Sequence, residues 1–224
     1  MWSYIKSKLG LSKDDGTIPL SQILPYVPDS PVVIEAGAFN GMDTLKLSKQ
    51  FNKGHIHAFE PVPEVYQQLV ERAGQLPNVT THPVALGAAP GTLTMYLSGA
   101  TAEQRSSSSL LPPKDHLKIH DHIAFDERIE VPVITLDGWA AEADVERVDF
   151  MWLDMQGNEL AVLKASPRIM ATVQAIYTEV SLVETYEGVP LYGELREWME
   201  SQGFTVAIEK LPWKDMGNVL FVRG

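Results

Sequence analysis

The sequence contains no cysteine. Disulfide bonds, thiolate metal sites and cysteine nucleophiles are therefore excluded. It also lacks an apolar run long enough to cross a membrane, and its N-terminus has no apolar core of the kind that a secretory signal needs. We therefore expect a cytoplasmic protein without a membrane span.

Basic residues are scarce relative to acidic ones. The 224 residues include 18 Lys and Arg against 29 Asp and Glu, which gives a net charge of −11. Few positive charges are available to neutralise phosphates, so we do not expect a nucleic-acid partner. A small neutral or cationic ligand remains compatible with this charge. The length suits one α/β domain with a sizeable core.

Short apolar runs alternate with segments of helical periodicity. The patterns predict strands at 32–35, 55–59, 79–85, 149–154, 175–180, 205–210 and 219–222, and helices at 41–51, 63–73, 159–164 and 192–201. Because crossover connections are right-handed, the first strands should form a parallel sheet with helices on both faces. The connection between the last two strands is too short for a helical crossover, so these two should be antiparallel.

Two segments lie outside this alternation within the single domain that we expect over residues 1–224. Trp2, Ile5 and Leu9 are at helical spacing within an N-terminal helical segment, 1–30, which we expect to dock on its own domain; a helix on a membrane surface is the alternative. An insertion at 88–136 is polar and rich in Ser, Pro and His between strand-like ends. Long loops in compact domains are often functional, so we interpret this insertion as a substrate lid.

The first predicted strand ends in VVIEAGAFNG, which places an acid and two glycines at the mouth of a strand. In open α/β sheets, ligands bind outside the carboxyl ends of the strands. Gly37 and Gly41 allow the backbone to approach a ligand closely. The second strand ends in HAFEP, and an acid at the position of Glu60 is suited to hold two ribose hydroxyls. The pattern indicates a nucleoside-containing cofactor.

The position of Glu35 bears on which cofactor this is. A dinucleotide fingerprint has a glycine there, because its helix N-terminus must hold a pyrophosphate. A carboxylate would repel a diphosphate and favour a ligand that carries an ammonium or a sulfonium group. S-adenosylmethionine has both groups, a ribose and no phosphate. Each feature also has a purely structural interpretation, with Glu35 satisfied by backbone amides and Glu60 stabilised by a helix dipole.

Six segments together resemble the FkbM family of S-adenosylmethionine-dependent methyltransferases. They are VVIEAGAFNGMDT, HAFEPVPEVYQQL, NVTTHPVALG, SSSSLLP, VPVITLD and VDFMWLDMQGNELAVLKAS, in collinear order over residues 31–182. The resemblance implies a class I methyltransferase fold, a Rossmann-like, doubly wound, seven-stranded sheet of order 3-2-1-4-5-7-6 with strand 7 antiparallel. Many members methylate hydroxyl groups of sugars or natural products, so the implied partner is a small-molecule acceptor.

The resemblance also implies which residues bind the cofactor. The methionine part would lie against Glu35, Gly37, Ala38, Asn40 and Gly41, the ribose against Glu60, and the adenine between Pro61, Val62, Val84, Ala85 and Leu86. The family often has Lys-Ile-Asp-x-Glu-Gly after the fourth strand, where this chain has Trp152 to Gly157. The Lys and the Glu are replaced, which could alter substrate preference, weaken a metal site or abolish transfer.

Methylation of a hydroxyl requires a base to remove its proton. Asp154, at the end of the fourth strand, is the first candidate, acting directly or through a divalent cation, and also adjoining the cofactor. Glu179, at the end of the fifth strand, is the candidate partner. Asp154 could instead be a structural acid that caps the following turn.

The insertion carries His116, His120 and His122 in the segment DHLKIHDH. Two imidazoles four residues apart on a helix could bind zinc, and one could accept a proton if the insertion covers the site. We nevertheless expect a solvated loop here, and no metal ligand is assigned. Residues 106–109 are serines, which fit either a flexible linker or a contact with the ligand.

Two other functions remain open from the sequence. One is a binding protein that holds its ligand on a methyltransferase fold without transferring the methyl group. The other is a nicotinamide-dependent oxidoreductase, which Glu35 disfavours.

Overall fold

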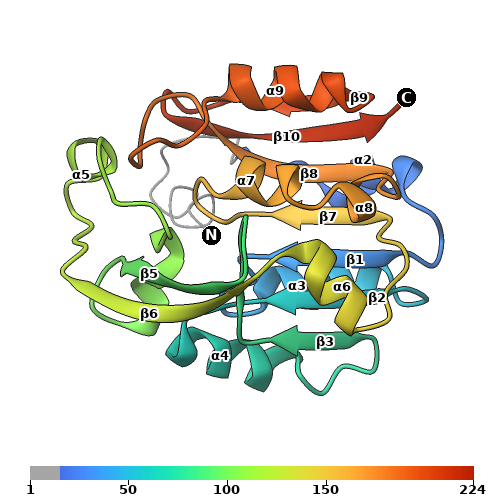
Figure 1. Ribbon diagram of the computed structural model, residues 1–224, viewed down its shortest axis with the longest axis horizontal. Coiled ribbons are helices and arrows are strands. Elements are labelled where there is room, and N and C mark those ends of the chain that lie inside the picture. Colours follow the sequence, from blue (N-terminus) through green and yellow to red (C-terminus); the bar gives the residue numbers. More distant parts are fainter. Residues whose placement is uncertain (1–15) are drawn as a thin grey trace.

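The structure is a computed structural model that describes residues 16–224, so the expected helix around Trp2, Ile5 and Leu9 lies outside the described residues. A seven-stranded sheet forms its centre (Figure 1). Its strands are β3 (Val79–His82), β2 (His55–Phe59), β1 (Val32–Ala36), β7 (Phe150–Leu153), β8 (Ala175–Ser181), β10 (Met216–Arg223) and β9 (Phe204–Lys210), in this spatial order. β10 is antiparallel to both β8 and β9, and the pairs among β3, β2, β1, β7 and β8 are parallel. The predicted order 3-2-1-4-5-7-6 with an antiparallel last strand is confirmed.

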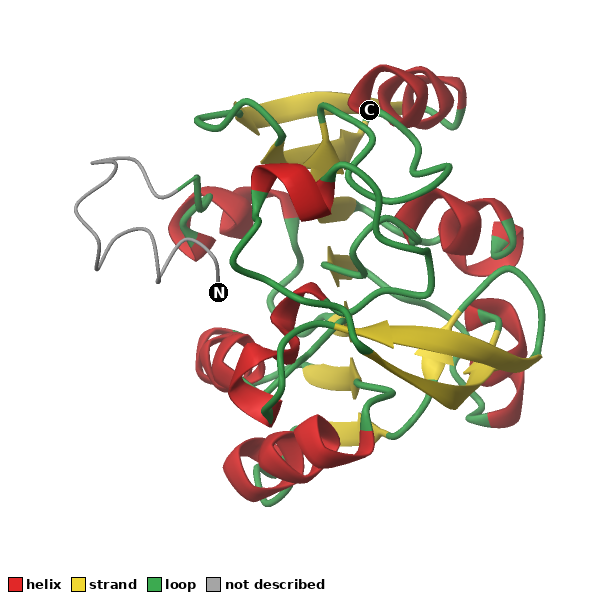
Figure 2. Cartoon of the chain, turned by 90° about the vertical axis from the view of Figure 1, so that its left-hand side faces the viewer, coloured by secondary structure: helices red, strands yellow, loops and turns green. Residues whose placement is uncertain are grey.

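Helices cover both faces of the sheet (Figure 2). One face carries α2 (Leu20–Ile23), α3 (Met42–Gln50) and α4 (Pro63–Ala73), with the turn η1 (Leu24–Tyr26) after α2; the other carries α6 (Leu136–Glu142), α7 (Glu159–Lys164), α8 (Pro167–Met170) and α9 (Tyr192–Ser201). Successive side chains of a strand point to opposite faces. Val33 accordingly packs with Leu47 of α3, whereas Ile34 packs with the side chains of α7 and α9. Burial on both faces explains why β1 is apolar almost throughout.

The third strand is shorter than predicted. β3 ends at His82, whereas the apolar pattern predicted a strand over 79–85. Pro83 follows and has no backbone N–H with which to continue the ladder. Ala85 and Leu86 instead form β4 (Ala85–Leu86), which pairs in parallel with β6 (Glu127–Ile134) in a second sheet.

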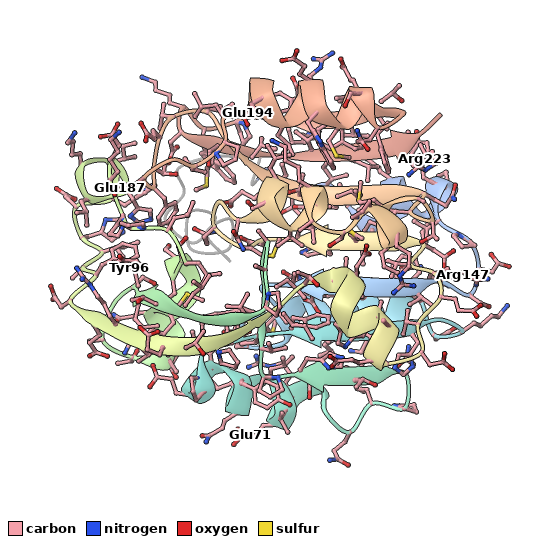
Figure 3. The ribbon with its side chains drawn as sticks, viewed as in Figure 1. Glu71, Tyr96, Arg147, Glu187, Glu194 and Arg223 are labelled. Carbon is pink, nitrogen blue, oxygen red and sulfur yellow. The ribbon has the colours of Figure 1, made fainter. Side chains whose placement is uncertain are left out.

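The insertion at 88–136 therefore has a fold of its own. β5 (Gly91–Leu97) pairs antiparallel with β6, and β4 completes a three-stranded sheet of order β4-β6-β5. Between β5 and β6 lie η2 (Ala102–Ser107) and α5 (His116–Ile119). Figure 3 shows Tyr96 of β5 at the same end of the molecule as Glu187, which follows β8, whereas Arg147, which precedes β7, lies at the opposite end. The insertion thus stands at the carboxyl ends of the parallel strands.

Gly37 permits the ends of β1 and β7 to meet. Its φ is +82°, and a Cβ atom added there would lie 1.8 Å from the carbonyl oxygen of Asp154. A side chain at this position would have to displace backbone and would also adopt a disfavoured conformation.

We expect Gly37→Ala to lower the free energy of unfolding by about 2–5 kcal/mol, measured by urea denaturation. Gly193→Ala is the matched control, because an added Cβ at this exposed position of α9 meets nothing within 4 Å. The control should change stability by less than about 1 kcal/mol, in the stabilising direction. Equal effects of the two substitutions would contradict the close approach of the two strands.

Candidate active site

A cavity of about 860 Å³ opens at the carboxyl ends of the parallel strands, beneath the insertion. The predicted site residues in its wall are Gly37, Ala38, Asn40, Glu60, Pro61, Val62, Val84, Ala85, Leu86, Asp154 and Glu179. They come from segments more than one hundred residues apart in sequence, which the parallel register brings to one edge. The volume lies in the range of small-ligand sites, about 300–1,000 Å³.

The turn after β1 is held by the end of β2. The backbone N–H groups of Gly37 and Ala38 both donate to the carbonyl oxygen of Phe59, at 3.1 and 3.0 Å. Phe39 has a positive φ of +48°, and its N–H donates to Glu60 Oε2 at 3.0 Å. The first two strand ends are therefore joined by backbone and carboxylate hydrogen bonds, so the turn is held in one conformation.

Glu60 lies at the end of β2 and is 6% exposed. Its Oε1 accepts the N–H of Val62 at 2.8 Å, while its Oε2 accepts that of Phe39. Burial raises the pKa of Glu60 to about 7, although the two backbone hydrogen bonds oppose the rise. Each carboxylate oxygen retains a free lone pair that can accept a ligand hydroxyl.

An apolar part of the wall lies beyond Glu60. Val62 and Leu86 are both buried, and Met95 and Leu110 of the insertion complete this part. The side-chain amide of Asn158 donates to the carbonyl oxygen of Leu86 at 2.9 Å, which ties the β4 strand to the loop after β7. This apolar part of the wall, called the apolar slot below, suits a flat ring.

Two residues predicted to contact the ligand, Glu35 and Gly41, lie outside the cavity wall. Glu35 is 1% exposed and outside the cavity wall. β1 continues to Ala36, so the side chain of Glu35 points to the face covered by α3, where burial raises its pKa well above the usual value and Thr44 opposes the rise. Glu35 thus lies behind the cavity wall in this structure, and its contact with the ligand stays a prediction.

Gly41 is also outside the wall. It precedes α3 with a φ of +78°, and an added Cβ would lie 2.9 Å from the Leu69 side chain. Its role in the structure is to start α3 close against α4.

The cavity wall contains two carboxyl groups side by side, those of Asp154 and Glu179. The Gln156 side-chain amide donates to Asp154 Oδ1 at 2.7 Å and to Glu179 Oε1 at 3.0 Å. Burial raises the pKa of both acids, and the negative charge of Asp154 raises that of Glu179 further. The hydrogen bond from Gln156 opposes the rise at Asp154.

The turn after β7 is capped by Glu159 and not by Asp154. Glu159 Oε1 accepts the N–H of Met155 at 2.6 Å, and Oε2 accepts that of Gly157 at 3.0 Å. The capping alternative considered for Asp154 is therefore filled by another acid, which leaves the Asp154 carboxyl directed at the cavity. Burial raises the pKa of Glu159 to about 7.

The serines at 106–109 contact the cavity or neighbouring backbone groups and do not form a flexible linker. Ser106 and Ser108 lie in the cavity wall. Ser109 is fully buried, and its Oγ donates to the carbonyl oxygen of Gln156 at 2.7 Å. Ser108 Oγ accepts the N–H of Ser98 at 3.0 Å.

A buried arginine joins the insertion to the main domain. The guanidinium of Arg105 contacts Glu64 of α4 and Glu127 of β6, each at 2.7 Å, and its side chain is 3% exposed. It lies in the cavity wall. The contact with Glu64 ties the insertion to the main domain, whereas the contact with Glu127 lies within the insertion.

Two of the three histidines, His116 and His120, are buried, contrary to the expected solvated loop, whereas His122 is exposed as expected. His116 and His120 are 1% and 4% exposed, and His120 Nε2 lies 2.8 Å from Asp215 Oδ2. Phe125 and Tyr186 pack against the ring of His116, which explains its burial. Neither histidine lies in the cavity wall, and no cluster of three or more His, Asp or Glu that could hold a metal ion occurs within residues 16–224.

Sequence reasoning missed the role of three residues near the acids. Gln156 lies in the segment after the fourth strand that departs from the family pattern, and the pattern assigns no role to it or to Glu159. Tyr186 donates from its hydroxyl to Gln156 Oε1 at 2.9 Å, and nothing in its local sequence indicates this contact. The capping role of Glu159 has a sequence signal, namely an acid at the start of a helix and four residues after Met155. An acid at this distance can accept the N–H groups of the turn before the helix.

Comparison with known proteins places the chain among methyltransferases. Residues 35–206 match the model of the methyltransferase FkbM domain. The chain is 31% identical over 164 residues to the 2-O-methyltransferase NoeI of Sinorhizobium fredii, covering 72% of this chain and 67% of that protein. It is 25% identical over 207 residues to methyltransferase 1 of Beauveria bassiana, covering 85% of this chain and 78% of that protein.

Solved structures share the fold at low sequence identity. The fibrillarin pre-rRNA processing protein of Methanococcus jannaschii aligns with a TM-score of 0.55 at 14% identity, over 99% of this chain and 76% of that chain. A Streptococcus mutans protein in complex with S-adenosylhomocysteine aligns with a TM-score of 0.50 at 14% identity, over 93% of this chain and all of that chain. These similarities support the class I methyltransferase fold. Within the described part of the chain, no helix has both the length and the apolar character that a membrane span requires.

The raised pKa of Glu60 predicts a dependence of stability on pH. In the folded protein the pKa of the Glu60 carboxyl is about 7, whereas the usual pKa of a Glu side chain is 4.5. The protonated carboxyl therefore contributes fully to stability below pH 4.5, and this contribution is lost as the pH rises to about 7. We expect the free energy of unfolding of the wild type, relative to Glu60→Gln, to fall by about 3 kcal/mol across this window, measured by urea denaturation at successive pH values.

Glu71→Gln is the control, since Glu71 is exposed on the same helix that follows Glu60 (Figure 3). Its stability relative to the wild type should be constant with pH. Parallel curves for the wild type and Glu60→Gln would show that burial does not shift the Glu60 carboxyl.

Proposed function

The chain belongs to the FkbM family of methyltransferases and uses S-adenosylmethionine as its methyl donor, and we propose that it methylates a hydroxyl group of a sugar or a natural-product small molecule. The observation that carries the proposal is the pair of carboxyl groups, Asp154 and Glu179, in the wall of the same cavity as Gly37 and Glu60. A hydroxyl acceptor needs a base, and this pair supplies one beside the cofactor turn.

The residues of the cavity fit the donor. Gly37, Ala38 and Asn40 form the turn against which its methionine part would lie. The free lone pairs of Glu60 can accept the two ribose hydroxyls. The apolar slot formed by residues that include Val62 and Leu86 suits the adenine ring.

When bound, S-adenosylmethionine supplies a methyl group activated by a positively charged sulfur. The chain contributes placement and proton transfer. Asp154 accepts the proton of the acceptor hydroxyl. Burial and the charge of Asp154 raise the pKa of the neighbouring Glu179 well above its usual value, so Asp154 is the better candidate for the ionised member of the pair. Holding the reacting groups in a near-attack arrangement accounts for much of the acceleration in such reactions.

The acceptor class rests on two further observations. The relative with 31% identity is named a 2-O-methyltransferase, which supports transfer to oxygen. The net charge of −11 disfavours RNA or DNA, because few positive charges are available for phosphates. We therefore propose a small, uncharged hydroxyl compound and not a nucleic acid as the partner.

Glu60→Ala should weaken binding of S-adenosylhomocysteine by about 1.5–3 kcal/mol, the contribution of hydrogen bonds to a charged group, measured by calorimetry. Glu71→Ala on the surface of α4 should leave the dissociation constant unchanged. An unaltered constant in Glu60→Ala would remove Glu60 from the ribose site. Binding of NAD in place of S-adenosylhomocysteine would favour the oxidoreductase alternative.

Turnover is tested with S-adenosylmethionine and a panel of methyl glycosides and phenols, by release of S-adenosylhomocysteine. Asp154→Asn should bind S-adenosylhomocysteine nearly as the wild type does and lower kcat by a factor of about 10²–10⁴, the usual contribution of a base. Asp29→Asn, at an exposed position before β1, is the control and should retain kcat. Normal turnover in Asp154→Asn would exclude it as the base, and S-adenosylhomocysteine binding without turnover of any acceptor would favour the binding-protein alternative.

A further inference from the structure

The amide of Gln156 lies between the two acids of the cavity. It is 6% exposed, and its Nε2 donates to Asp154 Oδ1 at 2.7 Å and to Glu179 Oε1 at 3.0 Å. An amide nitrogen carries two hydrogens, so both are used, one for each carboxyl group. The shorter of the two contacts is the one to Asp154.

The orientation of this amide is set from its other side. The hydroxyl of Tyr186 lies 2.9 Å from Gln156 Oε1 and 2.7 Å from the carbonyl oxygen of Ser107, so its single hydrogen is shared between these two acceptors. Burial raises the pKa of Tyr186 well above its usual value, so the hydroxyl keeps its proton at neutral pH. A flipped amide would turn its oxygen toward two carboxyl groups and lose both donations from Nε2, so the orientation with Nε2 toward the acids is favoured.

The backbone of Gln156 is held as firmly as its side chain. Its φ is +54°, which is unusual for a residue with a side chain, and Gly157 after it has a φ of +104°. Ser109 Oγ donates to the Gln156 carbonyl oxygen, and Glu159 accepts the N–H groups on either side of it. A backbone conformation of this kind costs about 1–3 kcal/mol and persists only where its surroundings determine it.

The amide of Gln156 is important because the two acids have no basic partner among the described residues. Within residues 16–224, no Lys or Arg forms an ion pair with Asp154 or Glu179. The other titratable groups that bear on the pair are carboxyls and a phenol, namely Asp43 of α3, Glu159 of α7, Asp215 and Tyr186. The basic side chains of the cavity wall, Lys46, Lys49, Arg72 and Arg105, form no ion pair with either acid, so Gln156 is a neutral donor that contacts both members of the pair.

We propose that Gln156 is the positioning residue of the base: its amide holds the carboxyl groups of Asp154 and Glu179 in one arrangement and stabilises the ionised form of Asp154 opposite the acceptor hydroxyl. This inference rests on the proposed function, in which Asp154 removes the acceptor's proton. Two consequences follow. Loss of the amide donors, or their replacement by a third carboxyl, raises the pH at which Asp154 becomes ionised, and turnover then requires a higher pH.

The direct test is carboxyl ¹³C NMR of protein labelled at its Asp and Glu side chains, titrated with pH in the presence of S-adenosylhomocysteine. Asp154→Asn and Glu179→Gln spectra assign the two signals. In Gln156→Glu and in the uncharged Gln156→Met, the midpoint of the Asp154 titration should rise by about one pH unit or more. Gln67→Glu, which makes the same charge change at an exposed position of α4, should leave it unmoved.

Midpoints that agree with the wild type within about 0.3 pH units in both Gln156 variants would overturn the inference. Using two variants guards against a folding defect in either one, and the control variant accounts for the effect of net charge alone. Tyr186→Phe should produce a smaller rise in the same direction, because it frees the amide to rotate without removing it.

Kinetics separate this inference from the proposed function. The pH profile of kcat, measured with the methyl glycoside or phenol that the wild type methylates best, should move to higher pH in Gln156→Met, with the dissociation constant for S-adenosylhomocysteine within about threefold of the wild type. Full turnover by Asp154→Asn would overturn the proposed mechanism itself. Loss of turnover in Asp154→Asn together with an unmoved pH profile in Gln156→Met would overturn only the role of Gln156.

Discussion

The contact between the ends of β1 and β7 is the constraint on which the rest of the site depends. An added Cβ on Gly37 would lie 1.8 Å from the carbonyl oxygen of Asp154, so only a glycine allows the two strands to finish side by side. Their parallel register then places the Gly37 turn, Glu60 and Asp154 at one edge of the sheet. A cavity at this edge follows from the geometry of a doubly wound sheet, because the connections diverge where the strands end. The Gly37 turn and the loop that carries Asp154 are therefore joined by a close backbone contact.

The insertion supplies part of the wall of the cavity at this edge. Its second sheet, β4-β6-β5, begins with Ala85 and Leu86, which are themselves part of the cavity wall. Arg105 ties the insertion to α4 through Glu64, and Ser109 ties it to the loop after β7. The same segment therefore shapes the slot beyond Glu60 and supports the loop that carries the acids.

Burial, more than ion pairing, sets the charges of the site. The pKa values of Glu35, Glu60, Asp154, Glu159 and Glu179 are all raised, and burial is the largest cause for each. Hydrogen-bond donors then distinguish one acid from another. Backbone N–H groups serve Glu60 and Glu159, whereas the side chain of Gln156 serves Asp154 and Glu179. An acid pair with a neutral donor between its members suits proton removal from an uncharged hydroxyl.

The sequence by itself determined the two-sided helical cover and, through the family resemblance, the sheet order. It also placed most of the predicted site residues in the cavity wall, because the ends of parallel strands meet at one edge. It also identified the family, through segments whose residues are close in the chain. It could not place Glu35, since β1 continues to Ala36 and the side chain of Glu35 lies on the same face of the sheet as Val33, beneath α3. Nor could it show that His116 and His120 are buried, or that Tyr186 orients Gln156 from 30 residues away. These outcomes depend on packing between segments distant in sequence, which no local pattern records, and only the tertiary structure decided them.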